Sequence, residues 1–181
     1  MDENYFKRIA NAETDQAKRF ADILIDIFNP SSVVDFGCAT GLYLKPFADK
    51  GIKVTGYDSS EAALGQPVIP GLHLQDITQP MTTDKVYDLA ICLEVLEHIP
   101  EADALRVVDN IVNFSEVVVF SAAQIGQKGT GHINCQPLEY WQGVFEGKGY
   151  KRDYPTGKLI VDRMKPGITS WLESNLMIFM K

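Results

Sequence analysis

One short segment of the sequence brings two carboxylates and an imidazole close together along the chain. It reads Glu94-x-x-Glu97-His98, and if a helical turn begins where the preceding apolar run ends, positions i, i+3 and i+4 point the same way. Such a set can hold a hard or borderline divalent cation, Mg²⁺ or Mn²⁺, with open positions for substrate oxygens. His132, in a glycine-rich loop, is a candidate fourth ligand. Without a metal, His98 or His132 would be suited to act as a general base near neutral pH.

A second feature that could do chemistry is a glycine turn after a β-branched run, Asp35-Phe36-Gly37-Cys38-Ala39-Thr40-Gly41. Its two glycines let the backbone turn sharply and let a ligand lie against it. The next strand-like segment ends in Asp58, a carboxylate placed to accept hydrogen bonds from both hydroxyls of a ribose. Together they predict an adenosine-type ligand. A dinucleotide fingerprint needs Gly-x-Gly-x-x-Gly, but Ala39 and Leu42 occupy its second and third glycine positions, which argues against an NAD-type oxidoreductase.

The elements that must position these residues follow from periodicity and turn signals. Apolar residues recur at helical spacing from Ala17 to Phe28, and Asn29-Pro30 ends this first helix. Strands are predicted over 33–36, 53–58, 72–74, 86–93, 117–120 and 176–180, alternating with helices near 44–50, after a Ser59-Ser60 cap, over 101–112 and from Pro137. Nearly continuous apolar strands suit a parallel sheet covered on both faces. The prediction is a doubly wound α/β domain, in which ligands bind beyond the carboxyl ends of the strands.

The glycine turn, Asp58, Asp76 in Gln75-Asp76-Ile77, and the segment from Tyr87 to Ile99 together resemble class I S-adenosylmethionine (SAM)-dependent methyltransferases. The resemblance runs from about residue 33 to 120. It implies a seven-stranded, mostly parallel, Rossmann-like sheet with an antiparallel C-terminal strand. It also implies that the turn packs against the methionine part of SAM, that Asp58 holds the ribose and that Asp76 lies by the adenine.

The same resemblance implies a set of cofactor-binding residues in these turns and strand ends: Asp35, Gly37, Cys38, Ala39, Gly41, Asp58, Ser59, Asp76, Ile77, Leu93 and Glu94. One position departs from the family pattern. Ala39 stands where many members carry glycine, and its methyl group is expected to crowd the cofactor slightly.

The Glu-x-x-Glu-His segment is similar to that of the ubiquinone-pathway O-methyltransferases, and an added histidine after the fifth strand is similar to the small-RNA 2′-O-methyltransferases. Both branches act on vicinal oxygens. By this resemblance, a cation held by Glu94, Glu97, His98 and His132 would bind two neighbouring acceptor oxygens and lower the pKa of the one to be methylated. Many metal-free methyltransferases carry a similar segment, in which these residues cap the next helix or line the cofactor pocket.

The acceptor side is expected over residues 124–175. Its parts are the loop 124–136, a helix carrying Tyr140 and Trp141, and the segment 154–171, with Tyr5-Phe6 as a further candidate. Trp141 and Phe145 lie at helical spacing, which is more typical of core residues. Lys151-Arg152 is interpreted as a solvated surface pair.

Composition limits the remaining classes of protein. A chain of 181 residues with 45% apolar content suits one domain over 1–181, opened by a helical segment over 1–30. With 17 basic against 24 acidic residues, nucleic acid is an unlikely partner. The apolar runs are too short to span a bilayer, the N-terminus lacks a basic-then-apolar leader, and the three cysteines form no Cys-x-x-Cys pair. We therefore expect a cytoplasmic protein in a reducing compartment, without a membrane partner.

The leading hypothesis is SAM-dependent O-methylation of a hydroxyl on a small molecule, with or without help from a bound Mg²⁺ or Mn²⁺. Metal-free N- or C-methyl transfer is the first alternative, and it would leave the glutamates structural. A module that binds SAM without turnover is the second. The residues do not separate these hypotheses, and they leave the oligomeric state open.

Overall fold

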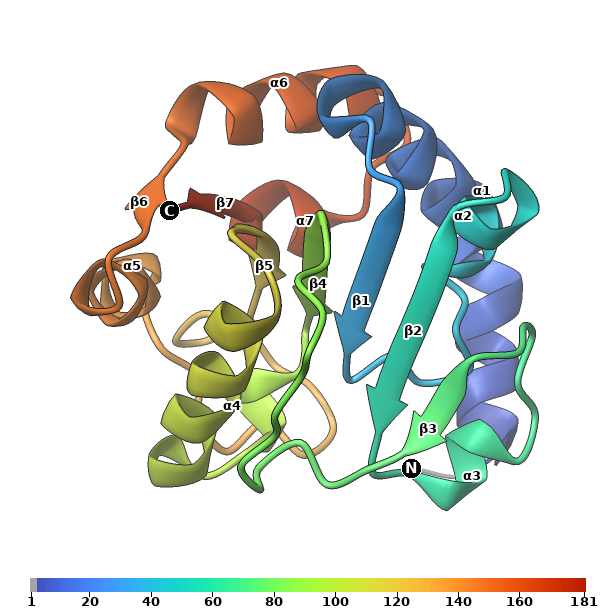
Figure 1. The fold of residues 1–181 in the computed structure, drawn as a ribbon, viewed down its shortest axis with the longest axis horizontal. Coiled ribbons are helices and arrows are strands. Elements are labelled where there is room, and N and C mark those ends of the chain that lie inside the picture. The colour runs from blue at the N-terminus through green and yellow to red at the C-terminus, as the bar shows by residue number, and fades with distance from the viewer. Residues whose placement is uncertain (1–2) are drawn as a thin grey trace.

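Seven strands form one sheet in the computed structural model, which describes the backbone of residues 3–181 and the side chains of residues 12–181. The strand order is β3-β2-β1-β4-β5-β7-β6 (Figure 1). The strands are β1 (Ser32–Phe36), β2 (Lys53–Asp58), β3 (Leu72–Leu74), β4 (Leu89–Leu93), β5 (Val117–Ser121), β6 (Lys151–Arg152) and β7 (Met177–Met180). Strands β1 to β5 pair in parallel, whereas β7 runs antiparallel to both of its neighbours. The predicted mostly parallel sheet with an antiparallel C-terminal strand is confirmed.

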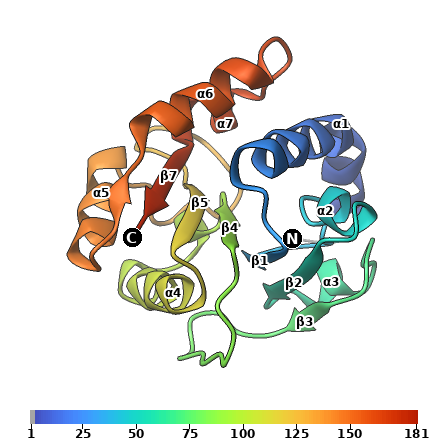
Figure 2. The ribbon, with the colours of Figure 1, turned by 45° about the horizontal axis from the view of Figure 1, so that its top comes forward.

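Helices cover both faces of this sheet (Figure 2). They are α1 (Glu3–Phe28), α2 (Lys45–Asp49), α3 (Glu61–Leu64), the 3₁₀ turn η1 (Leu96–His98), α4 (Glu101–Phe114), α5 (Leu138–Gly147), α6 (Tyr154–Met164) and α7 (Ser170–Asn175). Side chains of α4 and α5 share one core with the sheet, and side chains of α1, α2, α6 and α7 share the other. The fold is therefore doubly wound, as predicted.

The alternation of side chains along β1 shows how the two cores form. Val34 and Phe36 pack into the core that contains α4 and α5, while Val33 packs into the core on the opposite face. Neighbouring strands β1 and β4 pair directly, but the helices that follow them, α2 and α4, lie on opposite faces of the sheet. Such a reversal opens a crevice at the carboxyl ends of the two strands, where α/β proteins bind ligands.

Two short stretches differ from the sequence-based expectation. The strand predicted over 86–93 begins only at Leu89; before it, Val86 is 71% exposed and Tyr87 makes only an isolated parallel bridge to Ser115. Lys151-Arg152, interpreted as a solvated pair, forms the edge strand β6; Lys151 is exposed as expected, whereas Arg152 is half-buried and lies over the ring of Tyr154, 4.3 Å from its centroid. A charged two-residue edge strand carries no apolar alternation, so its sequence offers no strand signal. Among the described residues, no helix is both long and apolar enough to cross a membrane.

Candidate active site

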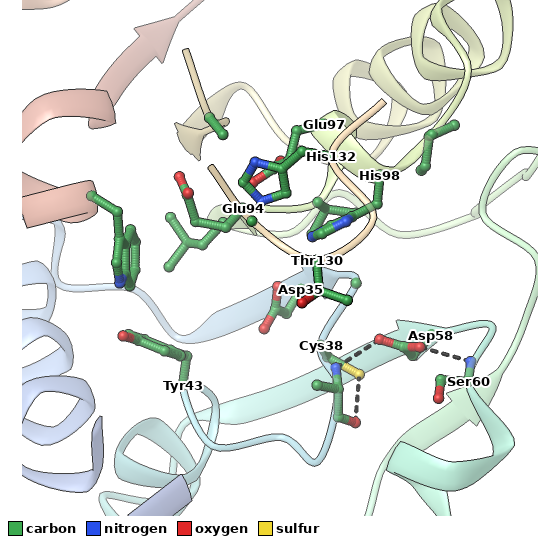
Figure 3. A pocket seen from close by; sticks show the side chains of 18 of the residues that line it. Asp35, Cys38, Tyr43, Asp58, Ser60, Glu94, Glu97, His98, Thr130 and His132 are labelled. Atoms are coloured by element: carbon green, nitrogen blue, oxygen red, sulfur yellow. Dashed lines mark hydrogen bonds between the residues drawn. The ribbon is translucent and has the colours of Figure 1, made fainter. Parts of the chain in front are cut away.

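A cavity of about 750 Å³ lies at the carboxyl ends of the parallel strands (Figure 3). This volume is typical of small-molecule sites, which measure about 300–1,000 Å³. All of the predicted cofactor-binding residues line the cavity except Gly41. At Gly41, φ is +84° and a Cβ would lie 2.9 Å from Leu72 Cδ1. Gly41 therefore serves the shape of the turn and its packing.

The glycine turn is held against the end of β2 by its own backbone. The N–H groups of Gly37 and Cys38 both donate to the carbonyl of Tyr57, at 2.8 and 3.1 Å. Gly37 has a φ of +81°, and a Cβ there would overlap Val95. Ala39 also has a positive φ, 47°, which costs a non-glycine residue roughly 1 kcal/mol. This strained conformation aims the Ala39 N–H at Asp58, on the neighbouring strand.

The Asp58 carboxylate is oriented by two backbone donors. Its Oδ2 accepts from the Ala39 N–H at 2.8 Å, and its Oδ1 accepts from the Ser60 N–H at 2.7 Å. Burial raises the pKa of Asp58, while the hydrogen bonds from Ser60 and Ala39 act in the opposite direction. Each oxygen keeps a further lone pair, so the carboxylate can still accept hydrogen bonds from a ligand.

Two more carboxylates line the same part of the cavity. Asp35, at the end of β1, is 5% exposed, and burial, with a smaller effect of the Asp58 carboxylate, raises its pKa to about 8. Asp76 is exposed instead, and its Oδ1 accepts from the N–H and hydroxyl of Thr78 at 2.9 and 2.6 Å. These hydrogen bonds lower the pKa of Asp76. Asp76 is therefore charged at neutral pH, while Asp35 is mostly protonated.

The helical turn predicted to begin at Glu94 begins later in the structure. Glu94 has a φ of +54°, and its N–H donates to the carbonyl and hydroxyl of Ser121 at 3.0 and 3.2 Å. The helical turn is η1, which starts two residues later. Glu94 therefore does not share a helical face with Glu97 and His98. Its Oε1 accepts instead from Asn175 Nδ2, at 3.1 Å.

The other three predicted metal ligands do come together. Potential ligand atoms of Glu97, His98 and His132 all lie within 4.8 Å of one another, and the two imidazole rings stand edge to face, 5.0 Å apart (Figure 3). Glu97 is 0% exposed, and among the described residues no well-formed hydrogen bond reaches either of its carboxylate oxygens, although the N–H groups of Glu97 and Ala123 lie close enough to act on its pKa. Burial, with a further contribution from the Glu94 carboxylate, raises the pKa of Glu97 to about 8.

Both histidines are oriented by backbone carbonyls. His98 Nδ1 lies 3.2 Å from the carbonyl oxygen of Gly131, and His132 Nδ1 lies 3.2 Å from that of Gln127. Because a carbonyl only accepts, Nδ1 carries the proton in each ring, and a neutral ring keeps its lone pair on Nε2. Metal-binding histidines commonly show this arrangement. Burial lowers the pKa of His98, and His132 adds to that effect, which favours the neutral ring.

The loop that carries His132 is tied to η1. The carbonyl of Glu97 accepts from the N–H groups of Ile133 and Asn134 at 2.8 and 3.0 Å, and Asn134 Nδ2 donates to the carbonyl of Leu96 at 3.2 Å. A Cβ at Gly129 would overlap the His132 ring. The loop therefore needs glycine at this position to bring His132 beside Glu97.

Asn175, a buried residue that the sequence analysis missed, links Glu94 to the loop that carries His132. Asn175 is 0% exposed, and its Nδ2 donates to Glu94 Oε1 and to Gln127 Oε1, at 3.1 and 3.0 Å. Its Oδ1 accepts from Gln124 Nε2 at 3.0 Å. Since the Gln127 carbonyl orients His132, Asn175 connects Glu94 to the loop that carries this histidine.

Residues of α1, of α7 and of the segment before α2 complete the wall of the cavity. Glu13, Tyr43 and Trp171 line the cavity, and the sequence analysis singled out only Trp171, as part of the segment 154–171. Tyr43 Oη donates to Glu13 Oε2 at 2.8 Å and accepts from Gln16 Nε2 at 2.8 Å. The rings of Tyr43 and Trp171 lie 6.3 Å apart, edge to face.

The aromatic residues of α5 do not reach the cavity. Trp141 and Phe145 are fully buried core residues, as their helical spacing predicted. Tyr140, a candidate for the acceptor side, donates its hydroxyl to Glu101 at 2.7 Å and does not line the cavity. Tyr5-Phe6 lies outside the side chains that the structure describes.

Comparison with known proteins decides the family. A sequence model described as a methyltransferase domain matches residues 1–122, more than half of the chain. The chain belongs to this methyltransferase family. The prediction of a class I SAM-dependent methyltransferase is thereby confirmed, together with its Rossmann-like fold.

Curated relatives of this methyltransferase include ubiquinone biosynthesis O-methyltransferases. The one from Nitrosomonas europaea is 26% identical over 151 residues, which cover 76% of this chain and 59% of the relative. The one from Rickettsia typhi is 34% identical over 74 residues, 37% of this chain and 30% of the relative. The matched parts thus span less than two thirds of these relatives.

Solved structures share the fold at lower identity. SAM-bound CalS10, an amino pentose methyltransferase from Micromonospora echinaspora, has a TM-score of 0.69 at 17% identity, over 92% of this chain and 90% of that one. The small RNA methyltransferase HEN1 has a TM-score of 0.66 at 18% identity, over 90% of this chain and 25% of that one. At these identities the likeness shows the fold alone.

Proposed function

We propose that the protein transfers the methyl group of SAM to a hydroxyl oxygen of a small acceptor, and that Glu97, His98 and His132 hold a divalent cation that binds this acceptor. The observation that carries the proposal is the fully buried Glu97 carboxyl beside two imidazoles. The N–H groups of Glu97 and Ala123 lie near this carboxyl, but among the described residues no well-formed hydrogen bond reaches either of its oxygens. A buried polar group left unpaired is costly. A cation would supply the missing partner.

The acidic side chains at the other end of the cavity suit the methyl donor. Asp58, oriented by Ala39 and Ser60, would accept hydrogen bonds from the two ribose hydroxyls. Asp35 would become ionised beside the positive charges of SAM, and Asp76 would lie by the adenine. These carboxylates bind and orient the donor, so that the remaining barrier is lowered mainly by positioning.

The kinds of side chain that would bind the metal narrow the choice of cation. Two imidazoles and one carboxylate are typical of borderline transition metals, whereas Mg²⁺ prefers oxygen ligands. Mn²⁺ is therefore a better fit than Mg²⁺. When bound, the cation would polarise the acceptor oxygen and lower the pKa of its hydroxyl. The protein's own residues hold the cation and keep Nε2 of each histidine unprotonated, through the carbonyls of Gly131 and Gln127.

The class of acceptor is supported by charge and by the relatives. A formal net charge of −7 disfavours nucleic acid, whose binding depends on neutralised phosphates. The curated relatives are named O-methyltransferases, in agreement with a hydroxyl acceptor. A second candidate uses the same residues without metal, with His98 as general base. The lowered pKa of His98, which keeps its ring neutral, and an Nε2 without a hydrogen-bond partner among the described residues favour it.

Labelled methyl transfer with and without chelator separates these candidates. The acceptor panel contains catechols, sugars, nucleosides and amines. We expect chelation to abolish transfer and Mn²⁺ to restore it, and we expect Glu97→Gln to lower turnover by more than about 100-fold. Glu139→Gln, an exposed glutamate on α5, is the matched control.

Each part of the proposal can fail separately in this assay. Full turnover in the chelator would refute the metal and leave His98 as the base. A label found only on nitrogen or carbon would refute O-methylation. No transfer to any acceptor, in a protein that binds SAM, would favour the non-catalytic module.

A further inference from the structure

The ionisable side chains that line the cavity are mostly acidic. Among the described lining residues, Lys128 is the only lysine or arginine. Six carboxylates oppose it: Glu13, Asp35, Asp58, Asp76, Glu94 and Glu97. The proposed function assigns the three aspartates to SAM and Glu97 to the metal, and Glu94 is bound by Asn175. Glu13 has no role in that scheme.

The position of Glu13 is fixed by hydrogen bonds across two elements. The hydroxyl of Tyr43 donates its only proton to Glu13 Oε2 and accepts from Gln16 Nε2. Gln16 Oε1 in turn accepts from the N–H of Thr169 at 2.8 Å, which ties α1 to the start of α7. Burial, and next the Glu13 carboxylate, raise the pKa of Tyr43. Tyr43 therefore remains a donor, and Glu13 is held as an acceptor at the cavity wall.

The surroundings of this carboxylate suit a positive charge. Tyr43 and Trp171 line the same cavity, with ring centroids 6.3 Å apart, and aromatic rings attract cations. Among the described residues, no lysine or arginine forms an ion pair with Glu13. Tyr43 contacts Oε2 of Glu13, and among the described residues Oε1 has no hydrogen-bond partner, so it can accept from a donor of the ligand.

We propose that Glu13, Tyr43 and Trp171 form a binding subsite for a positively charged ammonium group. The proposal rests on the proposed function, because the same cavity would hold SAM and the acceptor. Two ligands can supply the group: the α-ammonium of SAM itself, or an amine on the acceptor. In both cases an ammonium donates to Glu13 while the aromatic rings flank it.

The test removes the negative charge of Glu13 and keeps the shape of its side chain. Glu13→Gln retains an oxygen that can accept from Tyr43, so the hydrogen bonds to α1 are preserved. Asp15→Asn is the matched control, because Asp15 lies on the same helix, is exposed and does not line the cavity. Both variants remove one negative charge from α1.

The first arm of the experiment tests whether the cofactor supplies the ammonium group. Calorimetry compares S-adenosylhomocysteine (SAH) with an SAH analogue that lacks the α-amino group. If SAM supplies the ammonium, the wild type and Asp15→Asn bind SAH about tenfold more tightly than the analogue, as expected for a charge-assisted hydrogen bond. In Glu13→Gln this ratio falls to near one.

The second arm tests whether the acceptor supplies the ammonium group. It compares 3,4-dihydroxybenzylamine with 3,4-dihydroxybenzyl alcohol, which differ in the amine alone, on the protein with and without SAH. If the acceptor supplies the ammonium, the amine binds about tenfold more tightly, and Glu13→Gln alone removes the preference. The proposal is overturned if neither pair shows a preference that depends on Glu13, or if Asp15→Asn removes it equally. Absence of SAH binding would instead refute the proposed function, and the acceptor pair would still be measured on the cofactor-free protein.

Discussion

The buried Asp35 carboxyl should make the affinity for SAM depend on pH. Its pKa is raised to about 8, first by burial and then by the Asp58 carboxylate. At pH 7 the protein without ligand therefore holds Asp35 mostly protonated. The positive charges of SAM favour the ionised carboxylate, so binding is expected to expel a proton. Affinity should rise with pH, because a higher pH ionises Asp35 in advance.

The size of the effect follows from the ionised fraction of Asp35 in the free protein. For a pKa of about 8, this fraction is about 0.01 at pH 6, about 0.09 at pH 7 and about 0.5 at pH 8. If the carboxyl is fully ionised in the complex, affinity rises about 50-fold from pH 6 to pH 8. At pH 7, binding should release about 0.9 proton.

Calorimetry in two buffers of different ionisation enthalpy measures both quantities. Asp35→Asn imitates the protonated carboxyl, so we expect it to fold, to bind SAM weakly and to show little pH dependence. Glu97 also has a pKa raised to about 8, and Glu97→Gln should keep the pH dependence of SAM binding. A wild-type protein that releases no proton at pH 7 would refute the reasoning. So would an Asp35→Asn variant with the wild-type pH dependence.

Three other changes test the positioning of the site. Asn175→Leu should weaken Mn²⁺ binding about 10- to 100-fold, because Asn175 contacts Glu94 and Gln127 beside the proposed metal ligands. The affinity for SAH should stay within about twofold, and an unchanged Mn²⁺ affinity in a titration would contradict this role. Gly129→Ala should displace the His132 ring and abolish Mn²⁺-dependent transfer, whereas an α5 glycine with open space around it, Gly143, should tolerate alanine with a slightly higher Tm. Asp58→Ala should weaken SAH binding about tenfold or more, and equal affinity by calorimetry would refute the ribose assignment.

The cofactor half of the site could be predicted because its signals are local. A glycine turn and a carboxylate that ends the next strand are each visible in the sequence, and parallel strands bring their carboxyl ends to one edge of the sheet. The same rule placed His132, after β5, near His98. What it could not provide was the backbone of Glu94, whose positive φ takes this residue out of the helical turn that follows, although its carboxylate still acts on that of Glu97.

The rest of the cavity depends on contacts between segments far apart in the chain. Glu13 and Tyr43 meet because α1 packs beside the glycine turn, and Asn175 reaches Glu94 from the junction of α7 and β7. A single polar residue near a chain end carries no such information. On α1 a signal was present: Gln16 continues the spacing of the buried residues Phe20 and Leu24. A polar residue in register with an apolar helical face is a candidate for a buried hydrogen bond.

The two carboxyls with strongly raised pKa explain how an acidic cavity can persist in the folded protein. Asp35 lies near the carboxyl end of β1 and Glu97 follows β4, and these strands are neighbours in the sheet. Near neutral pH both carboxyls can bind a proton, since each pKa is about 8, and this removes two buried charges when no ligand is present. Under the proposed function, SAM replaces one proton and the metal replaces the other. Both ligands should therefore bind more weakly as the pH falls below 8. Below that pH, activity should fall more steeply with pH than it would if only one group were protonated.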